Sequence, residues 1–278
     1  MNHHPVFSVF PIADEGTDFI GARFRPDFLE PHGGKLPPVD NEYFEWIDLL
    51  ESVAGANGRY VMVELGAGYG RWAVRAACAA RSRGVPFHIV AVEPEPQHFE
   101  WLKETLLENG VGSNQYTTVN AAVSVDRSAA QLYVGGHGHD AATWYGQRLA
   151  WDAASIEDGQ YCGRQASVHP SGYKSVTVET VTLSDLLAPF PLVDLIDMDI
   201  QGEEYAVIRS AWEVLNRKVK RMHVGTHSRE VETSIRRLLL AEGWTCRADY
   251  AGCAEHHTPW GRVEFEDGVQ SWRNPRLQ

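Results

Sequence analysis

The chain of 278 residues contains little cysteine, and its cysteines are not spaced for metal or redox chemistry. No two of the four form a CxxC pair, which excludes a zinc ribbon or a redox dithiol of that type. So few cysteines in a chain of this length are typical of a reducing compartment. We therefore predict a cytoplasmic protein.

Long apolar runs and an excess of positive charge are also missing. No apolar run approaches the roughly 20 residues that span a bilayer, and the N-terminus lacks the charged-then-apolar pattern of a signal peptide. The net charge is -12, and a surface that acidic repels phosphate backbones. We therefore expect neither a membrane nor a nucleic acid as a partner. Apolar residues make up 44% of the chain, which is enough for a full core.

What the sequence does have is an alternation of short apolar runs with helical patterns. Apolar runs typical of buried parallel strands cover 61–65, 88–93, 117–125, 193–199, 219–226 and 244–250. Helical spacing recurs between most of them. This alternation predicts an α/β fold in which helices cover both faces of a doubly wound, mostly parallel seven-stranded sheet. An Asp-Gly turn also predicts a hairpin over 260–269.

The first strand ends in the glycine-rich turn Glu-Leu-Gly-Ala-Gly-Tyr-Gly over 64–70. Glycines allow close backbone approach, and the helix N-terminus behind them offers free N–H groups. An anion beside the turn is unfavourable for a pyrophosphate but suits the ammonium and sulfonium charges of S-adenosylmethionine. Glu93 ends the second strand, where a carboxylate can accept hydrogen bonds from both ribose hydroxyls. We therefore expect the cofactor to contact Glu64, Gly66, Ala67, Gly68, Tyr69, Gly70, Glu93 and Pro94.

Other interpretations of the same residues remain open. Glu64 and Glu93 can instead serve only to cap helices. An NAD(P)-dependent oxidoreductase needs the same fold and the same ribose-binding acid, although its fingerprint is GxGxxG rather than the GxGxG found here. A non-catalytic, cofactor-binding partner subunit is a third alternative.

Three segments together resemble the FkbM family of class I methyltransferases. They are the glycine turn over 64–70, Val-Glu-Pro over 92–94, and Asp-Met-Asp-Ile-Gln-Gly-Glu-Glu over 197–204. The segments 120–124 and 178–187 fit the same family. The resemblance implies transfer of a methyl group from S-adenosylmethionine to a hydroxyl of a sugar or secondary metabolite. Ala122 and Asp197 join the expected cofactor-binding residues, although Asp197 stands where family members usually carry Lys.

Methyl transfer to oxygen requires that the acceptor be aligned and lose a proton. Three side chains that follow the fourth and fifth strands are candidates for the catalytic base, namely Asp199, Glu203 and His227. The ordinary histidine pKa of about 6.5 suits a base near neutral pH. Asp197, Asp199 and His227 are alternatively ligands for Mg²⁺, because alternate residues of a strand share a face. The sequence leaves open which residue is the base and whether a metal binds.

Two further segments accompany the expected methyltransferase domain over 59–278. Residues 1–58 are interpreted as an N-terminal arm and helix, from which Tyr43 and Trp46 are expected to close over the cofactor. The stretch 135–173 has no clear period, and we predict an irregular insertion that lines the acceptor site. Its aromatic residues suit a small-molecule acceptor such as a sugar or natural product. A homo-oligomer is compatible with these patterns but not required by them.

Overall fold

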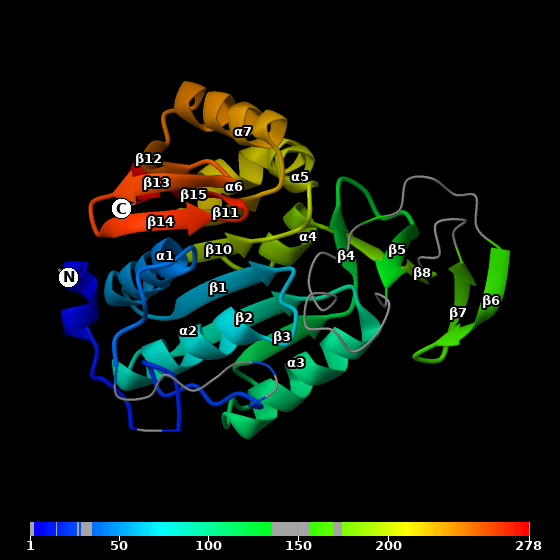
Figure 1. The fold of residues 1–278 in the computed structure, drawn as a ribbon, viewed down its shortest axis with the longest axis horizontal. Helices are drawn as coiled ribbons and strands as arrows, with labels where there is room; N and C mark the ends of the chain where they lie inside the picture. Colours follow the sequence, from blue (N-terminus) through cyan, green and yellow to red (C-terminus); the bar gives the residue numbers. More distant parts are fainter. Residues whose placement is uncertain are drawn as a thin grey trace.

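The computed structural model describes residues 3–14, 16–26, 28, 35–134, 149, 156–168 and 174–277. Its centre is a seven-stranded sheet with the strand order β12-β15-β11-β10-β1-β2-β3 (Figure 1). Five neighbouring strands run parallel: β3 (Tyr116–Val119), β2 (Phe87–Val92), β1 (Tyr60–Leu65), β10 (Leu195–Met198) and β11 (Arg221–Thr226). The strand β15 (Gly268–Arg273) lies antiparallel between β11 and β12 (Thr245–Tyr250). The predicted mostly parallel seven-stranded sheet is therefore confirmed.

The sheet has a separate apolar core on each face, because alternate side chains of a strand point to opposite sides. Met62 of β1 packs on one side, and Val61 and Val63 pack on the other. The first core also contains residues of α1 (Tyr43–Ala54), α2 (Arg71–Ser82) and α3 (Pro96–Glu108). The second contains residues of α4 (Leu183–Leu187), α5 (Glu204–Ser210), α6 (Trp212–Lys218) and α7 (Arg229–Ala241). Among the described helices, none is long and apolar enough to cross a membrane.

The N-terminal arm is part of the first core. Phe7 of the short 3₁₀ helix η1 (Pro5–Val9) stacks on Tyr43, with 5.2 Å between ring centroids. Tyr43 is fully buried and Trp46 is 3% exposed. The prediction that these two side chains close over the cofactor is wrong, because both are buried in the first core, where Trp46 packs on Phe19 and on Trp72 of α2. The division of the chain after residue 58 stays a prediction.

The described residues between 122 and 182, which flank and enter the expected insertion, form two additional sheets. The run 117–125 is divided between β3 and β4 (Ala122–Ser124), and β4 pairs with β9 (Thr180–Thr182) outside the central sheet. A four-stranded antiparallel sheet follows, composed of β5 (Ala130–Val134), β8 (Lys174–Val178), β7 (Arg164–Val168) and β6 (Ile156–Tyr161) in that order.

The prediction of irregular structure is therefore wrong for 156–168. Its physical reason lies in β7, where Ala166 is the one fully buried residue, so the strand lacks an apolar alternation strong enough to recognise. The histidines and most aromatic residues of the expected insertion, including His137, Trp144 and Trp151, lie outside the described residues.

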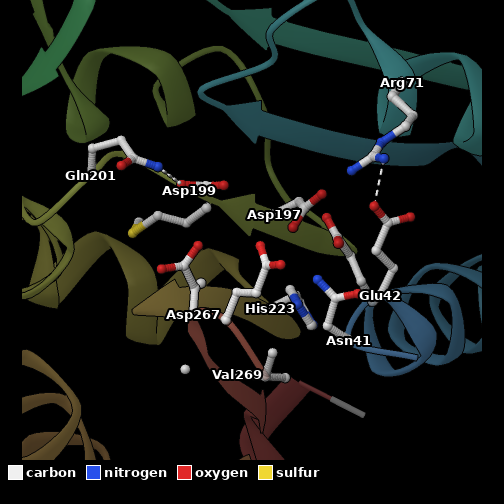
Figure 2. A pocket seen from close by; sticks show the side chains of 14 residues that line it. Asn41, Glu42, Arg71, Asp197, Asp199, Gln201, His223, Asp267 and Val269 are labelled. Carbon is white, nitrogen blue, oxygen red and sulfur yellow. Dashed lines mark hydrogen bonds and ion pairs between the residues drawn. The ribbon is translucent and has the colours of Figure 1, made fainter. Parts of the chain in front are cut away.

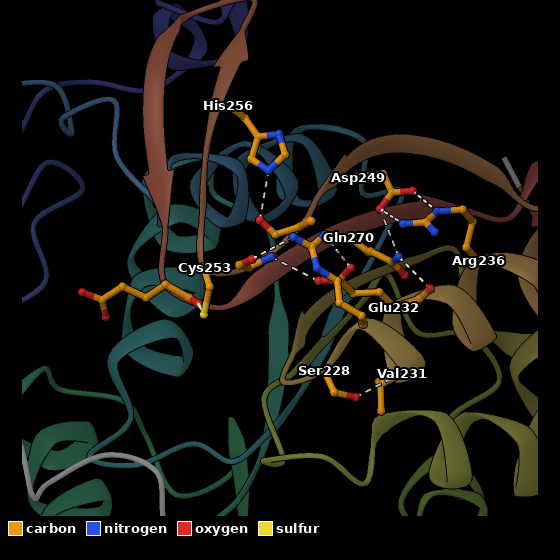
Figure 3. A network of polar contacts seen from close by, with 12 residues as sticks. Ser228, Val231, Glu232, Arg236, Asp249, Cys253, His256 and Gln270 are labelled. Atoms are coloured by element: carbon orange, nitrogen blue, oxygen red, sulfur yellow. Dashed lines mark hydrogen bonds and ion pairs between the residues drawn. The ribbon is translucent and has the colours of Figure 1, made fainter.

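The C-terminal strands pair differently from the prediction. β13 (Ala254–Thr258) and β14 (Gly261–Phe265) form a hairpin, while β15 leaves β14 after Asp267 and enters the central sheet. The hairpin predicted around Asp267-Gly268 is therefore wrong. Figure 3 shows the hydrogen bonds that hold β15 in this position. The fully buried Gln270 donates from Nε2 to Asp249 Oδ1 and to the Glu232 carbonyl, both at 3.1 Å. A buried amide requires such partners, and β12 and α7 supply them.

Candidate active site

The glycine turn is pressed against the loop that follows β10. Gly66 has a φ of 84°, and a Cβ added there would lie 1.9 Å from the carbonyl oxygen of Asp199. A Cβ on Gly70 would lie 2.5 Å from Leu102 Cδ1 of α3. Gly68 also has a positive φ, 54°, but faces open space. The turn therefore needs glycine for two different reasons, and it places Asp199 directly beside the expected donor site.

Glu64 caps the helix that follows the turn. Its carboxylate accepts hydrogen bonds from the N–H groups of Trp72, at 3.3 Å, and Ala73, at 2.9 Å, in the first turn of α2. Burial raises the pKa of Glu64 well above its ordinary value, and the nearby charge of Asp197 raises it further. The capping interpretation is confirmed for Glu64. A direct contact between Glu64 and the cofactor stays a prediction.

Glu93 joins the end of β2 to the glycine turn. Its Oε2 accepts a hydrogen bond from Gly68 N at 2.7 Å, and its Oε1 accepts one from Glu95 N at 2.8 Å. Burial raises its pKa to about 8, against the lowering effect of these two N–H groups. Each carboxylate oxygen keeps a second lone pair for a ligand hydroxyl. The structure thus brings together the glycine turn and the acid that were predicted to share one ligand.

The other expected cofactor residues lie around this pair. Asn120 donates from its amide to the carbonyl oxygens of Glu93, at 2.8 Å, and Pro94, at 3.3 Å, and so fixes the turn after β2. Ala122 follows in β4 and is buried. Ala67 and Tyr69 are buried within the glycine turn itself. The predicted set is therefore spatially contiguous, although its contacts with a cofactor stay a prediction.

A cavity of about 540 Å³ lies at the carboxyl ends of β10 and β11, next to the glycine turn (Figure 2). Asp197 of β10 and Asp199, which directly follows the strand, both line it, as expected from their alternate positions. Six carboxylates line the cavity, from Glu42, Glu45, Asp197, Asp199, Glu266 and Asp267. The remaining lining residues are Asn41, Arg71, Met198, Gln201, His223, Gly225, Gly268 and Val269. The cavity is therefore acidic and strongly polar.

His227 is held between carboxylates beside this cavity. Its Nδ1 lies 2.8 Å from Glu204 Oε1, and its Nε2 lies 3.2 Å from Asp199 Oδ1. Burial alone would lower the pKa of His227, but the two carboxylates raise it to about 10. The pKa of His227 therefore lies above the ordinary value of about 6.5 on which its role as a base was predicted, and that role stays a prediction. Partial burial works to raise the pKa of Asp199, but the charge of His227 prevails and lowers it.

We expect this ion pair to make stability depend on pH. The folded-state pKa of His227, about 10, exceeds the unfolded value of about 6.5, so its stabilising contribution is complete below the lower value and is lost as the pH rises through the higher one. The free energy of unfolding should fall more steeply between neutral pH and about pH 10 in the wild type than in His227→Gln. Urea unfolding across this range measures both slopes, and equal slopes would contradict the assignment.

The carboxylate that orients His227 comes from Glu204 rather than from Glu203. Glu204 is fully buried and also accepts hydrogen bonds from the N–H groups of Ile200, at 3.3 Å, and Gly202, at 3.0 Å. Glu203 is half-buried at the N-cap of α5 and does not line the cavity. Glu204 could not be singled out from the sequence, because two adjacent acids at a helix start do not show which one points inward.

A row of acids on α1 was also missed. Glu42, Glu45, Asp48 and Glu51 recur at every third position, which places them on one side of the helix. Three of them meet a cationic or ionisable partner on the chain: Glu42 Oε1 lies 2.5 Å from Arg71, Asp48 Oδ2 lies 2.8 Å from His223 Nδ1, and Glu51 Oε2 lies 2.8 Å from Arg221. Glu45 instead faces the Asp197 carboxylate. The three-residue spacing within an apolar helix was the pattern that could have identified this row.

Comparison with known proteins agrees with this geometry. The Methyltransferase FkbM domain matches residues 64–243. This chain belongs to the FkbM methyltransferase family. A protein of Jannaschia sp. (strain CCS1) that is named as a candidate methyltransferase is 28% identical over 273 residues, which cover 94% of this chain and 92% of that one. The resemblance drawn from the sequence motifs is therefore confirmed, and the protein is a methyltransferase.

Solved methyltransferase structures are similar to this chain at low sequence identity and with TM-scores below 0.5. A precorrin-6y C5,15-methyltransferase from Geobacter metallireducens GS-15 is 11% identical, with a TM-score of 0.47, over 95% of this chain and 98% of that chain. A methyltransferase FkbM from Methylobacillus flagellatus KT is 11% identical, with a TM-score of 0.46, over 84% of this chain and 55% of that chain.

Proposed function

We propose that this methyltransferase uses S-adenosylmethionine and transfers its methyl group to a hydroxyl of a sugar or secondary metabolite. The observation that carries the proposal is the hydrogen bond between Gly68 N and Glu93, which joins the glycine turn to the acid expected to bind the ribose. The same turn lies beside Asp199. The turn would receive the methionine part of the donor, and Glu93 would accept hydrogen bonds from its ribose. Ala67, Tyr69, Pro94 and Ala122 would surround the rest.

The capping of α2 by Glu64 favours S-adenosylmethionine over a dinucleotide as the ligand of the glycine turn. A pyrophosphate binds to the free N–H groups at a helix N-terminus. In α2 two of these groups already donate to the Glu64 side chain, so they are not free to bind a pyrophosphate. The sulfonium and ammonium groups of S-adenosylmethionine do not need these N–H groups. An NAD(P)-dependent activity is therefore disfavoured.

Asp199 is the best candidate for the catalytic base. His227 lies between two carboxylates and carries its proton at neutral pH, so it has no free lone pair to offer. The Asp199 side chain is 57% exposed and faces the cavity, and Gln201 donates to it at 2.9 Å. His227 and Gln201 would orient this carboxylate. S-adenosylmethionine supplies a methyl carbon that its sulfonium already activates, so the chain needs to align the acceptor oxygen and take its proton.

The cavity favours an acceptor rich in hydroxyl groups. Carboxylates accept hydrogen bonds but donate none, so six of them around one space suit a ligand that offers several O–H groups. We assign the acceptor to this cavity; a contribution from the insertion 135–173 stays a prediction. A screen of sugars and hydroxylated metabolites, with release of S-adenosylhomocysteine as the readout, tests the acceptor class. Turnover that persists when the reacting hydroxyl is replaced by hydrogen would contradict O-methylation.

Removing the Glu93 carboxylate should weaken donor binding. A hydrogen bond contributes about 0.5–1.5 kcal/mol, so loss in Glu93→Ala of the two that Glu93 would make with the ribose is expected to reduce the affinity for S-adenosylhomocysteine by about 10- to 100-fold. Isothermal titration calorimetry measures this change. Glu100→Ala, which removes an exposed carboxylate from α3, serves as the matched control and should bind like the wild type. Equal affinities of both variants would remove Glu93 from the donor site.

A further inference from the structure

Glu45 is the acid of the α1 row that faces another carboxylate, and it lines the cavity. Ligand atoms of Glu45, Asp197 and His223 all lie within 4.8 Å of one another. Asp197 and His223 are each 4% exposed, and Glu45 is half-buried. The Glu45 carboxyl group hydrogen-bonds to the Asp197 carboxylate, and burial raises the pKa of both groups. Two carboxyl groups so close together cannot both ionise without a balancing positive charge, so they hold a proton that a bound cation would replace.

His223 is prepared to act as a ligand. Its Nδ1 lies 2.8 Å from Asp48 Oδ2, and Ser271 Oγ also donates to that oxygen. An ionised carboxylate only accepts hydrogen bonds, so Nδ1 carries a proton and Nε2 is the nitrogen at which a metal ion would bind, in place of a second proton. A carboxylate that holds the far nitrogen of a histidine in this way fixes the ring and its tautomer toward a metal. The lining of the cavity by His223 and Asp197 is visible in Figure 2.

We propose that Glu45, Asp197 and His223 bind a divalent transition-metal ion at the floor of the cavity. One imidazole nitrogen and two carboxylates form a mixed donor set, which suits Mn²⁺, Fe²⁺ or Zn²⁺ better than the all-oxygen shell that Mg²⁺ prefers. This set shares only Asp197 with the ligands expected from the sequence, because Asp199 and His227 already pair with each other. The remaining coordination positions would open toward the cavity.

The ion would bind an oxygen of the acceptor and lower the pKa of its hydroxyl. This role rests on the proposed function, whereas binding of the ion itself does not. The proton of the bound hydroxyl would pass to the Asp199 carboxylate, and the acceptor oxygen would form the new bond to the methyl carbon as the carbon–sulfur bond breaks and leaves its electron pair on sulfur. The metal changes no oxidation state in this step.

Titration of Mn²⁺ into EDTA-treated protein, followed by electron paramagnetic resonance of the free ion, tests the site. We expect one ion per chain, and an affinity at least tenfold lower in Glu45→Gln and in His223→Ala. The matched controls Glu264→Gln and His257→Ala change exposed residues of the β13–β14 hairpin and should bind Mn²⁺ like the wild type. Because His223 is buried, Glu45→Gln carries the test if His223→Ala does not fold. Asp48→Asn should weaken binding by about 10- to 100-fold through the histidine.

Absence of Mn²⁺ binding at millimolar concentration would overturn the site, and the acidic cavity would then suit a cationic acceptor. Equal binding by Glu45→Gln and Glu264→Gln would overturn it as well. Titration of S-adenosylhomocysteine on the same samples separates the two proposals. Glu45→Gln that has lost Mn²⁺ but keeps its S-adenosylhomocysteine affinity supports the metal site. A wild type that binds Mn²⁺ but not S-adenosylhomocysteine supports the metal site and contradicts the proposed donor.

Discussion

Gly66→Ala is expected to destabilise the protein by about 4 kcal/mol and to remove its binding of S-adenosylhomocysteine. Alanine in the left-handed region costs about 1–2 kcal/mol by itself. The larger cost comes from the new Cβ, which would lie 1.9 Å from the Asp199 carbonyl oxygen, a backbone atom that no side-chain rotation can move. The glycine turn and the loop after β10 would have to separate, and the donor site and Asp199 would separate with them.

Gly68→Ala is the control for this prediction. Gly68 lies in the same turn and has a positive φ of 54°, but no atom within 4 Å would meet its Cβ. Its substitution should cost only the strain of the backbone, about 1–2 kcal/mol. Urea unfolding measures both variants on the same scale. If Gly66→Ala were no less stable than Gly68→Ala, the close approach of the two loops would not be present in solution.

Asp199→Asn is expected to lower kcat by about 100- to 10,000-fold, the usual contribution of a catalytic base. Asparagine keeps the shape of the side chain and its place beside Gln201, but it does not accept the proton of the acceptor hydroxyl. Donor binding should change little, since the Asp199 carbonyl oxygen that touches the glycine turn remains. Steady-state rates with an acceptor found in the screen, together with calorimetry of S-adenosylhomocysteine, measure the two effects separately.

Glu213→Gln provides the comparison for this variant, because it removes an exposed carboxylate of α6 away from the cavity. Its kcat should match that of the wild type. An Asp199→Asn enzyme that retains wild-type kcat would show that another group takes the proton. His227→Gln would then need the same assay, since loss of its positive charge raises the basicity of Asp199 while it removes the group that orients it.

The parts of the fold and site that the sequence predicted depend on local patterns. The glycine turn, Glu93 and the strands around them are each defined by residues within a few positions of one another. A strand, a tight turn and a helix start each have local physical requirements, so the donor side could be located before the structure was known.

The parts that the sequence did not predict depend on contacts between distant segments. Asp48 and His223 are separated by 175 residues, and nothing near either one indicates the other. Glu204 was indistinguishable from Glu203 until the position of His227 defined which side of α5 faces inward. The insertion of β15 between β11 and β12 depends on partners for the buried Gln270 that come from α7 and β12. These pairings and orientations are determined by the packing of the whole domain.

Calorimetric titration of S-adenosylhomocysteine into the purified wild-type protein tests the central claim, with NADH titrated in parallel. We expect one molecule of S-adenosylhomocysteine to bind per chain with micromolar affinity, and no binding of NADH. Absence of S-adenosylhomocysteine binding at millimolar concentration, or binding of NADH in its place, would contradict the assignment of the glycine turn and Glu93 to a methyl donor.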